Sequence, residues 1–369
     1  MDFYIKDSKN FINQDVTIRG WVFNKRSSGS IVFLQIRDGS GFIQAVASKK
    51  DVSPETFEAA VNLTDESSVI VKGRLKEEPR SPYGYEINIS DLNIIHLSQN
   101  FPIAKKMHGV DFLLSLRHLW LRSRKQWAIL RVRNQIINAI NEFLQNNGYI
   151  KIDAPIITPS ACEGTTTLFP LKYFDKTAYL SQSGQLYLEA AIFSFGKCYD
   201  FGPTFRAEKS KTKRHLTEFW MMDAEAAFLE YDELLKLEEN LVYFVIQEIL
   251  KNCQQEFQIL GRDPGPLQKI KPPFLRLTYQ ETLMELRKLG SDIKDGEDLG
   301  NDDETILMNH FDQPLFIMKF PATFKAFYFR EIKKTPVLLF PLISWRLKDM
   351  AKLRAEAREK TIMKLFWQE

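Results

Sequence analysis

Residues 205–219 read FRAEKSKTKRHLTEF, in which an arginine and a glutamate two positions apart precede a basic run. Side chains two apart on a strand point to the same side, so Arg206 and Glu208 are expected to project into one pocket. The basic residues of 209–214 would then cover that pocket with positive charge. A planar guanidinium beside a carboxylate suits a nucleoside triphosphate. The same stretch also fits an antiparallel hairpin with a solvated, charged turn.

Length and composition indicate a soluble globular protein with two domains: 369 residues, 44% hydrophobic and 26% charged. A Walker-type phosphate loop is excluded, because no G-x-x-x-x-G-K-[ST] pattern occurs. The net charge of +3 does not by itself identify a nucleic-acid-binding protein, although basic residues concentrate in 117–133 and 209–214. We find neither a signal-peptide core nor an apolar run long enough to span a membrane, so a cytoplasmic location is expected.

The three cysteines, Cys162, Cys198 and Cys253, are far apart and form no C-x-x-C pair. Their spacing favours neither a zinc site nor a disulfide framework. Buried free thiols are therefore expected.

The first part of the chain, from 16 to about 97, contains five short segments rich in β-branched and aromatic residues. A helical stretch over 54–63 falls between the third and the fourth. This order predicts an OB-fold β-barrel over residues 1–100, followed by a hinge over 101–118. Another small β-barrel remains an alternative.

The second part, 119–336, alternates helical and strand patterns and predicts an α+β domain on an antiparallel sheet. A long amphipathic helix is expected over 123–147, with Gly148 as its stop. The stretch 149–158 is expected to be a strand that Pro155 restricts to a sheet edge or an interface.

Four blocks in this order resemble the class II aminoacyl-tRNA synthetases of the aspartyl, asparaginyl and lysyl subgroup, and within it the asparaginyl-tRNA synthetases. The blocks are RHLWLRSRK (117–125), SQSGQLYLEAA (181–191), FRAE with RHLTEF (205–219) and FPATFKAFYFRE (320–331). The resemblance covers about 16–336. It implies ATP-dependent activation of L-asparagine to the adenylate, with Mg²⁺, and transfer to tRNA(Asn) in protein synthesis.

The resemblance also implies roles for the residues of 205–219 in ATP binding. Arg206 would hold the α-phosphate and stabilise charge as the carboxylate attacks, and Glu208 would accept hydrogen bonds from the adenine amino group. Arg214 and His215 would contact the outer phosphates. Phe219 would stack on adenine, with core packing as its alternative.

Amino-acid binding requires acceptors around an α-ammonium group. By resemblance, Glu163, Gln185 and Asp223 form that cage. Glu225 lies two positions after Asp223 on the same strand face and would bind metal or orient the site, although a solvated carboxylate is an equal alternative. No metal ligand is assigned.

The choice between asparagine and aspartate depends on the segment QLYLE, which contains Leu188 and Glu189. Similar aspartyl enzymes carry a lysine here that pairs with the substrate carboxylate. A missing cation beside an added carboxylate disfavours aspartate and suits a neutral amide.

By the same resemblance, the OB domain would read an anticodon by stacking and edge hydrogen bonds. Phe33 matches the stacking position and Gln44 the base-reading amide, whereas Arg26 and Arg37 would contact backbone or bases. Phe33 could instead be barrel core, and Arg37 could belong to a structural ion pair. A homodimer is expected, because the long helix and the Pro155 strand form the interface in this family.

The chain departs from the family pattern after about residue 336. The third class motif and the preceding GGS-x-R block are absent, and a basic tail occupies 337–369. Reading the codons from Asp349 onward in a shifted frame permits the peptide GYGEI(T/A)GGSQRE, which resembles the missing block. A one-base frameshift between 336 and 349 is therefore expected, and it would leave the catalytic domain incomplete at its C-terminus and inactive. Aspartate–tRNA ligase and a non-catalytic tRNA-binding remnant are the alternatives.

Overall fold

The computed structural model of the chain describes residues 3–81, 83–162, 168–208, 216–321, 337–338 and 342–344. Its contacts divide the chain into two compact units, Met1–His108 and Gly109–Glu369, and each is described by itself. Two sets of predicted site residues, Glu163 and the loop 209–215, lie outside the described residues. So does the tail 337–369, apart from two short strands.

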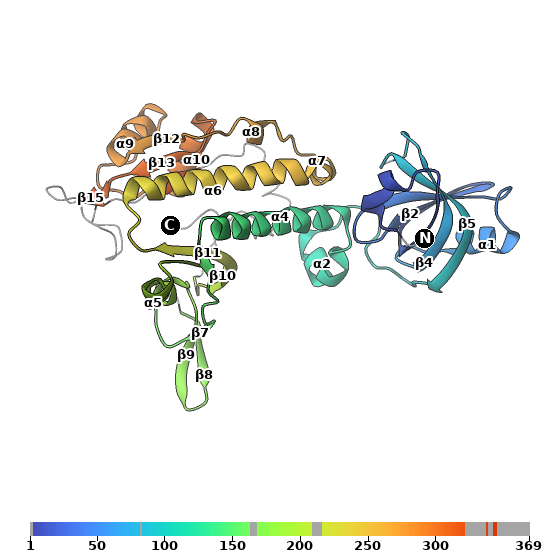
Figure 1. Ribbon diagram of the computed structural model, residues 1–369, viewed down its shortest axis with the longest axis horizontal. Coiled ribbons are helices and arrows are strands. Elements are labelled where there is room, and N and C mark those ends of the chain that lie inside the picture. The colour runs from blue at the N-terminus through green and yellow to red at the C-terminus, as the bar shows by residue number, and fades with distance from the viewer. Residues whose placement is uncertain are drawn as a thin grey trace. The chain divides into compact units, whose positions relative to one another are not determined.

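The first unit is a closed barrel with the strand order β1-β2-β3-β5-β4 (Figure 1). After the 3-10 helix η1 (Ile5–Asn10), its strands are β1 (Asp15–Ser28), β2 (Ile31–Arg37), β3 (Phe42–Ser48), β4 (Ser68–Glu77) and β5 (Tyr85–His96). Helix α1 (Pro54–Asn62) follows the third strand and begins after Ser53, whose side chain accepts a hydrogen bond from the Thr56 amide. The predicted OB fold is confirmed.

The barrel core follows from strand alternation. On β2, Val32, Leu34 and Ile36 are fully buried, and Phe33 and Gln35 face the other side. Gly73 lies where β4 and β5 come closest, because a Cβ there would collide with the carbonyl oxygen of Asn88. The inward apolar set therefore fixes the register, and the outward face of β2 is left for polar and aromatic side chains.

Arg37 forms a buried ion pair within this fold, in line with the structural alternative, while its contact with an anticodon stays a prediction. Its guanidinium donates to both carboxylate oxygens of Glu66, at 3.1 and 2.9 Å, and lies 5.8 Å from the centre of the Trp21 ring. Both charged side chains are buried, with 9% and 4% exposed. A bidentate pair of this kind ties the end of β2 to the residue that leads into β4.

Replacing Glu66 by Ala should destabilise the barrel by about 3–5 kcal/mol, because it leaves the Arg37 charge buried and unpaired. The matched control is Asp91→Ala, which breaks the exposed Lys72–Asp91 pair at 2.9 Å and should cost less than about 1 kcal/mol. Native-state hydrogen exchange of the strands in 15–96 measures both. Equal effects of the two substitutions would contradict a structural role for the Arg37–Glu66 pair.

The second unit is built on a sheet with the order β11-β10-β6, made of β11 (Glu218–Ala226), β10 (Lys197–Phe205) and β6 (Ile150–Lys151). Helices α4 (Arg124–Asn146) and α6 (Tyr231–Asn252) cover one face, and the core there includes Tyr199, Phe201 and Ile140. Helix α5 (Gln185–Phe195) packs against the same two strands from the other side (Figure 1). One face of the β10–β11 hairpin is thus structural core, and the other faces α5.

The remaining elements surround this sheet. The short helices α2 (Val110–Ser115) and α3 (Arg117–Trp120) precede α4. A second sheet, β7-β9-β8, consists of β7 (Ile157–Thr158), β9 (Lys176–Leu180) and β8 (Pro170–Tyr173). A third contains β12 (Leu275–Thr278), β13 (Leu315–Met318) and β16 (Leu342–Ser344), and β14 (Phe320–Pro321) pairs with β15 (Val337–Leu338). The other helices are α7 (Gln254–Leu260), α8 (Gly265–Gln268), α9 (Tyr279–Lys288) and α10 (Asn301–His310).

Two predictions about the second unit have different outcomes. The long helix is confirmed: α4 begins after Ser123, whose Oγ accepts from the Gln126 amide, and Gly148 follows its end with a φ of 82°. The expected strand interrupted by Pro155 is confirmed at sheet edges, since β6 and β7 on either side of Pro155 are both edge strands, but the two belong to different sheets. All three cysteines are free, and Cys198 and Cys253 are buried, as predicted. In the described part of the chain, no helix combines the length and hydropathy needed to cross a membrane.

Candidate active site and nucleic-acid interface

The pairing of β10 with β11 brings four carboxylates toward one site. Asp200 lies opposite Asp223, and the next pair on the same face places Cys198 opposite Glu225. Glu189 of α5 acts electrostatically on Glu225 from the helix that covers this face. Residues from two strands and a helix therefore form one acidic cluster.

Asp223 holds the turn that leads into α5. Its Oδ2 accepts hydrogen bonds from the Ser183 hydroxyl at 2.9 Å and from the Gly184 amide at 2.8 Å. The Gln185 amide in turn donates to Ser183 Oγ at 3.0 Å. A carboxylate fixed by two donors at a helix start is preorganised to face a cation, which fits the predicted ammonium site.

Burial and mutual repulsion perturb this acidic group. Burial, followed by the charges of Glu189 and Asp223, raises the pKa of Glu225 to about 7. Burial and the neighbouring Asp223 raise the pKa of Asp200 to about 6. A bound ammonium would lower the pKa values of Glu225 and Asp200, because a nearby positive charge favours their charged forms.

Ligand binding should therefore strengthen as pH rises from about 5.5 to 7. Glu225 and Asp200 have raised pKa values, so they are largely neutral at the lower pH and gain their charges through about 6 to 7. An α-ammonium group, with an ordinary pKa of about 7.7–8.0, keeps most of its proton up to about pH 7, so the rise is read below that pH. Calorimetric titration of a non-hydrolysable asparaginyl-adenylate analogue across the range measures the effect. Glu225→Gln should flatten the profile, and an unchanged profile in that variant would contradict the assignment.

Sequence reasoning missed Asp200. It is 8% exposed, and a Cβ at Gly184 would lie 2.7 Å from its Oδ2, so the glycine makes room for this carboxylate. The residue stands beside Asp223 only through strand pairing across the hairpin. A predicted pairing register for the two strands would have placed it opposite Asp223.

Helix α5 contributes residues both to the core and to the acidic cluster. Gln185 Nε2 donates to Glu189 Oε1 at 2.9 Å, which joins two predicted amino-acid-binding residues. Leu188 is fully buried, and the Cys198 thiol lies against its carbonyl oxygen. Leu188 therefore packs α5 onto the sheet, and its predicted role in amino-acid binding stays a prediction. Leu188 would affect specificity because it is uncharged where similar aspartyl enzymes carry a lysine.

The residues predicted to bind ATP are only partly placed. The Arg206 guanidinium lies 5.6 Å from the centre of the Phe219 ring, and Phe219 is 4% exposed. The strand ends at Phe205, and the Glu208 amide donates to the Arg206 carbonyl at 2.9 Å, so the backbone turns there. The assumption that Arg206 and Glu208 alternate on a strand is wrong for this reason. Arg214 and His215 lie outside the described residues.

The barrel presents the predicted base-reading residues on one face. Phe33 of β2 pairs with Arg26 of β1 and with Val46 of β3, and Gln44 lies two residues before Val46. Phe33 and Gln44 are half-buried and Arg26 is exposed. An aromatic ring beside an amide on an open sheet face is the arrangement that stacks and reads a single-stranded base.

Comparison with known proteins places both units in described families. Residues 109–347 match the model of tRNA synthetases class II (D, K and N), and residues 16–95 match that of the OB-fold nucleic acid binding domain. The chain is 51% identical over 319 residues to the asparagine–tRNA ligase of Desulforamulus reducens, covering 86% of this chain and 74% of that protein. It is 47% identical over 332 residues to the asparagine–tRNA ligase of Pelotomaculum thermopropionicum, with 90% and 77% covered.

Solved structures agree with this likeness. The crystal structure of asparaginyl-tRNA synthetase from Pyrococcus horikoshii complexed with asparaginyl-adenylate superposes with a TM-score of 0.86 at 40% identity, over 93% of this chain and 80% of that one. Asparaginyl-tRNA synthetase from Entamoeba histolytica, also in complex with asparaginyl-adenylate, gives a TM-score of 0.80 at 28% identity over 92% and 79%.

Proposed function

The chain belongs to the class II tRNA synthetases of the D, K and N group. From this we propose that it is an asparagine–tRNA ligase. The reaction joins L-asparagine to ATP to give asparaginyl-adenylate and pyrophosphate, and then transfers the asparaginyl group to tRNA(Asn). The observation that carries the proposal is the acidic cluster of Asp223, Glu225 and Glu189 beside the Ser183–Gln185 turn. It suits an amino acid held by its ammonium group.

In this reaction Asp223 binds the α-ammonium and keeps its position through Ser183 and Gly184. Arg206 stabilises the charge that develops on the α-phosphate, because a fixed cation in a partly dry site acts more strongly than in water. Phe219 provides an aromatic face beside Arg206 for adenine. Glu163, Glu208, Arg214 and His215 complete the ATP and amino-acid contacts by resemblance.

Mg²⁺ enters the proposal as the usual partner of ATP phosphates. Among the described residues no group of three His, Cys, Asp or Glu side chains could hold a metal ion. The described part of the site therefore does not fit a dedicated metal cage, and no step is assigned to the ion.

Asparagine is preferred over aspartate in this proposal. A substrate carboxylate would approach Glu189 and Glu225 with no cation at position 188, where Leu188 is fully buried. Repulsion between like charges in a partly buried site is costly, so aspartate is disfavoured. The alternative of an aspartate–tRNA ligase is tested by comparing the two amino acids in ATP–pyrophosphate exchange.

The barrel is proposed to bind the anticodon of tRNA(Asn) through Phe33, Gln44 and the exposed Arg26. Residues 1–100, 101–118 and 119–336 serve as anticodon-binding domain, hinge and catalytic domain. The reaction is placed in the cytoplasm, where tRNA is charged. A homodimer is supported by the exposed side chains of Ile150, Ile156 and Ile157 around Pro155. Sedimentation analysis of the chain tests the dimer.

Residues 337–369 are proposed to come from a one-base shift of the reading frame between 336 and 349. The permitted peptide in the other frame, GYGEI(T/A)GGSQRE, supports this, as does the end of the family match at residue 347. The sequence of the gene across this segment, read independently on both strands, tests the proposal. If the gene carries no extra or missing base in this segment, a non-catalytic tRNA-binding protein becomes the favoured alternative.

A further inference from the structure

A row of polar side chains crosses the outer face of the barrel. Strand pairing places the following residues opposite one another in turn, from β1 through β2, β3 and β5 to β4: Asn24, Gln35, Gln44, Glu86 and Lys76. Gln44 is thus flanked by a carboxylate on one side and by β2, which carries Phe33, on the other. Gln44 is the member of this row that the proposed anticodon site uses, and Glu86 and Lys76 lie beyond it.

Glu86 links the two ends of the row. Its Oε2 accepts a hydrogen bond from Gln44 Nε2 at 2.6 Å, and its Oε1 lies 3.1 Å from Lys76 Nζ. Glu86 is 7% exposed, whereas the Lys76 side chain is 38% exposed. A buried carboxylate that loses its cation would lose its fixed position, so Lys76 matters more here than an ordinary surface lysine.

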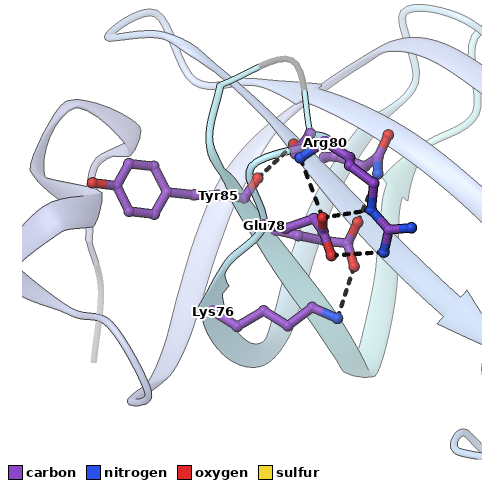
Figure 2. Close-up of polar contacts among 7 residues, drawn as sticks. Lys76, Glu78, Arg80 and Tyr85 are labelled. Carbon is purple, nitrogen blue, oxygen red and sulfur yellow. Dashed lines mark hydrogen bonds and ion pairs between the residues drawn. The ribbon is translucent and has the colours of Figure 1, made fainter.

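The hairpin beyond these residues holds them in register. The Ser81 hydroxyl donates to the Tyr85 carbonyl at 2.7 Å, and Arg80 Nε donates to Glu78 Oε1 at 3.0 Å (Figure 2). Figure 2 shows Lys76 directly below this closed turn. The turn fixes the ends of β4 and β5, so Lys76 and Glu86 stay opposite each other.

The carboxylate determines which way the Gln44 amide faces. A carboxylate only accepts hydrogen bonds, so Gln44 must turn its NH₂ group toward Glu86. The two amide atoms lie on opposite sides of the group, and Oε1 is therefore directed away from Glu86. On that side Gln44 offers an acceptor, which complements a base edge with an N–H donor.

We propose that Lys76 is a positioning residue for base recognition. By pairing with Glu86 it keeps the carboxylate in place, and the carboxylate fixes Gln44 as a hydrogen-bond acceptor for a base stacked on Phe33. This rests on the proposed anticodon-binding function of the barrel. The preferred base carries an imino N–H, as uracil and guanine do, and a base with an acceptor at that position, cytosine or adenine, is rejected.

The test uses the full chain and fluorescence anisotropy with anticodon stem-loop RNA. The reference RNA carries GUU, and three variants replace one base each, G by A or U by C, which exchanges the imino donor for an acceptor. Lys76→Met should lower the preference for the reference over one variant about tenfold, since a good base contact discriminates to that extent. Lys76→Arg should restore the preference.

Lys72→Met is the matched control, because Lys72 lies on the same strand in an exposed ion pair with Asp91 at 2.9 Å. It removes the same charge, so both variants should lose a similar, base-independent part of the affinity. Glu86→Gln, whose amide both donates and accepts, should also lower the preference.

Two results would overturn the proposal in different ways. If Lys76→Met and Glu86→Gln keep the same preference as Lys72→Met, the positioning role is wrong while the binding function stands. If the unmodified chain binds all four RNAs equally, the anticodon-binding function itself fails, and the role of Lys76 fails with it.

Discussion

Restoring one base between the codons for residues 336 and 349 should raise asparagine-dependent ATP–pyrophosphate exchange at least about a thousandfold over the chain as it stands. The peptide GYGEI(T/A)GGSQRE of the restored frame would supply the metal-binding carboxylate and the GGS-x-R block of the family pattern. Removing one group that stabilises charge in the transition state typically lowers the catalytic rate by roughly 10²- to 10³-fold. Exchange measured with both proteins at equal concentration gives the ratio directly.

The control for this comparison is Arg206→Ala in the frame-restored protein. Arg206 lies against Phe219 at the proposed adenine site, so this variant should lose most of the regained exchange. Activity that survives the substitution would come from a contaminating enzyme or another site. Strong exchange by the chain as given would contradict the frameshift proposal.

The second large effect is expected for Asp223→Asn, which should weaken binding of the asparaginyl-adenylate analogue about a hundredfold or more. The Asn oxygen can still accept from Ser183 and Gly184, which Asp223 contacts at 2.9 and 2.8 Å, so the turn before α5 is retained. What is lost is the negative charge that faces the ammonium, and losing one partner of a desolvated charge pair costs about 2–5 kcal/mol. Calorimetric titration measures it.

Glu218→Gln is the matched control for Asp223→Asn. Glu218 begins the same strand, β11, but lies on the opposite face and is exposed. The substitution Glu218→Gln removes one carboxylate that lies outside the acidic cluster, so affinity for the analogue should stay within about twofold. Similar losses in both variants would indicate a general charge effect and would contradict the ammonium site.

The fold was largely predictable because its elements are locally encoded. The apolar period of α4 and the capping Ser123 determine that helix, and alternation determines the barrel strands. The errors lie where the chain turns without a strong local signal. The backbone turns after Phe205 instead of continuing as a strand, so Arg206 and Glu208 do not alternate on one.

The site was predictable only where a motif names its residues. Gln185 and Phe219 stand in recognisable blocks and Asp223 follows one of them by four positions, and the structure places them on α5 and β11. Partners that come from elsewhere in the chain were missed: Asp200 reaches Asp223 through strand pairing, and Glu86 reaches Gln44 across 42 positions. The partner of Arg37 in its structural ion pair, Glu66, was not found either, because it is 29 positions away.

Charging of tRNA with radiolabelled asparagine and, separately, aspartate by the frame-restored protein tests the central claim most directly. The acidic cluster without a cation at Leu188 predicts that asparagine is charged and that aspartate is charged at least about 10³-fold more slowly, since a site that leaves a buried charge unpaired discriminates strongly. Aspartate charged as fast as asparagine, or no charging with either amino acid, would contradict the account.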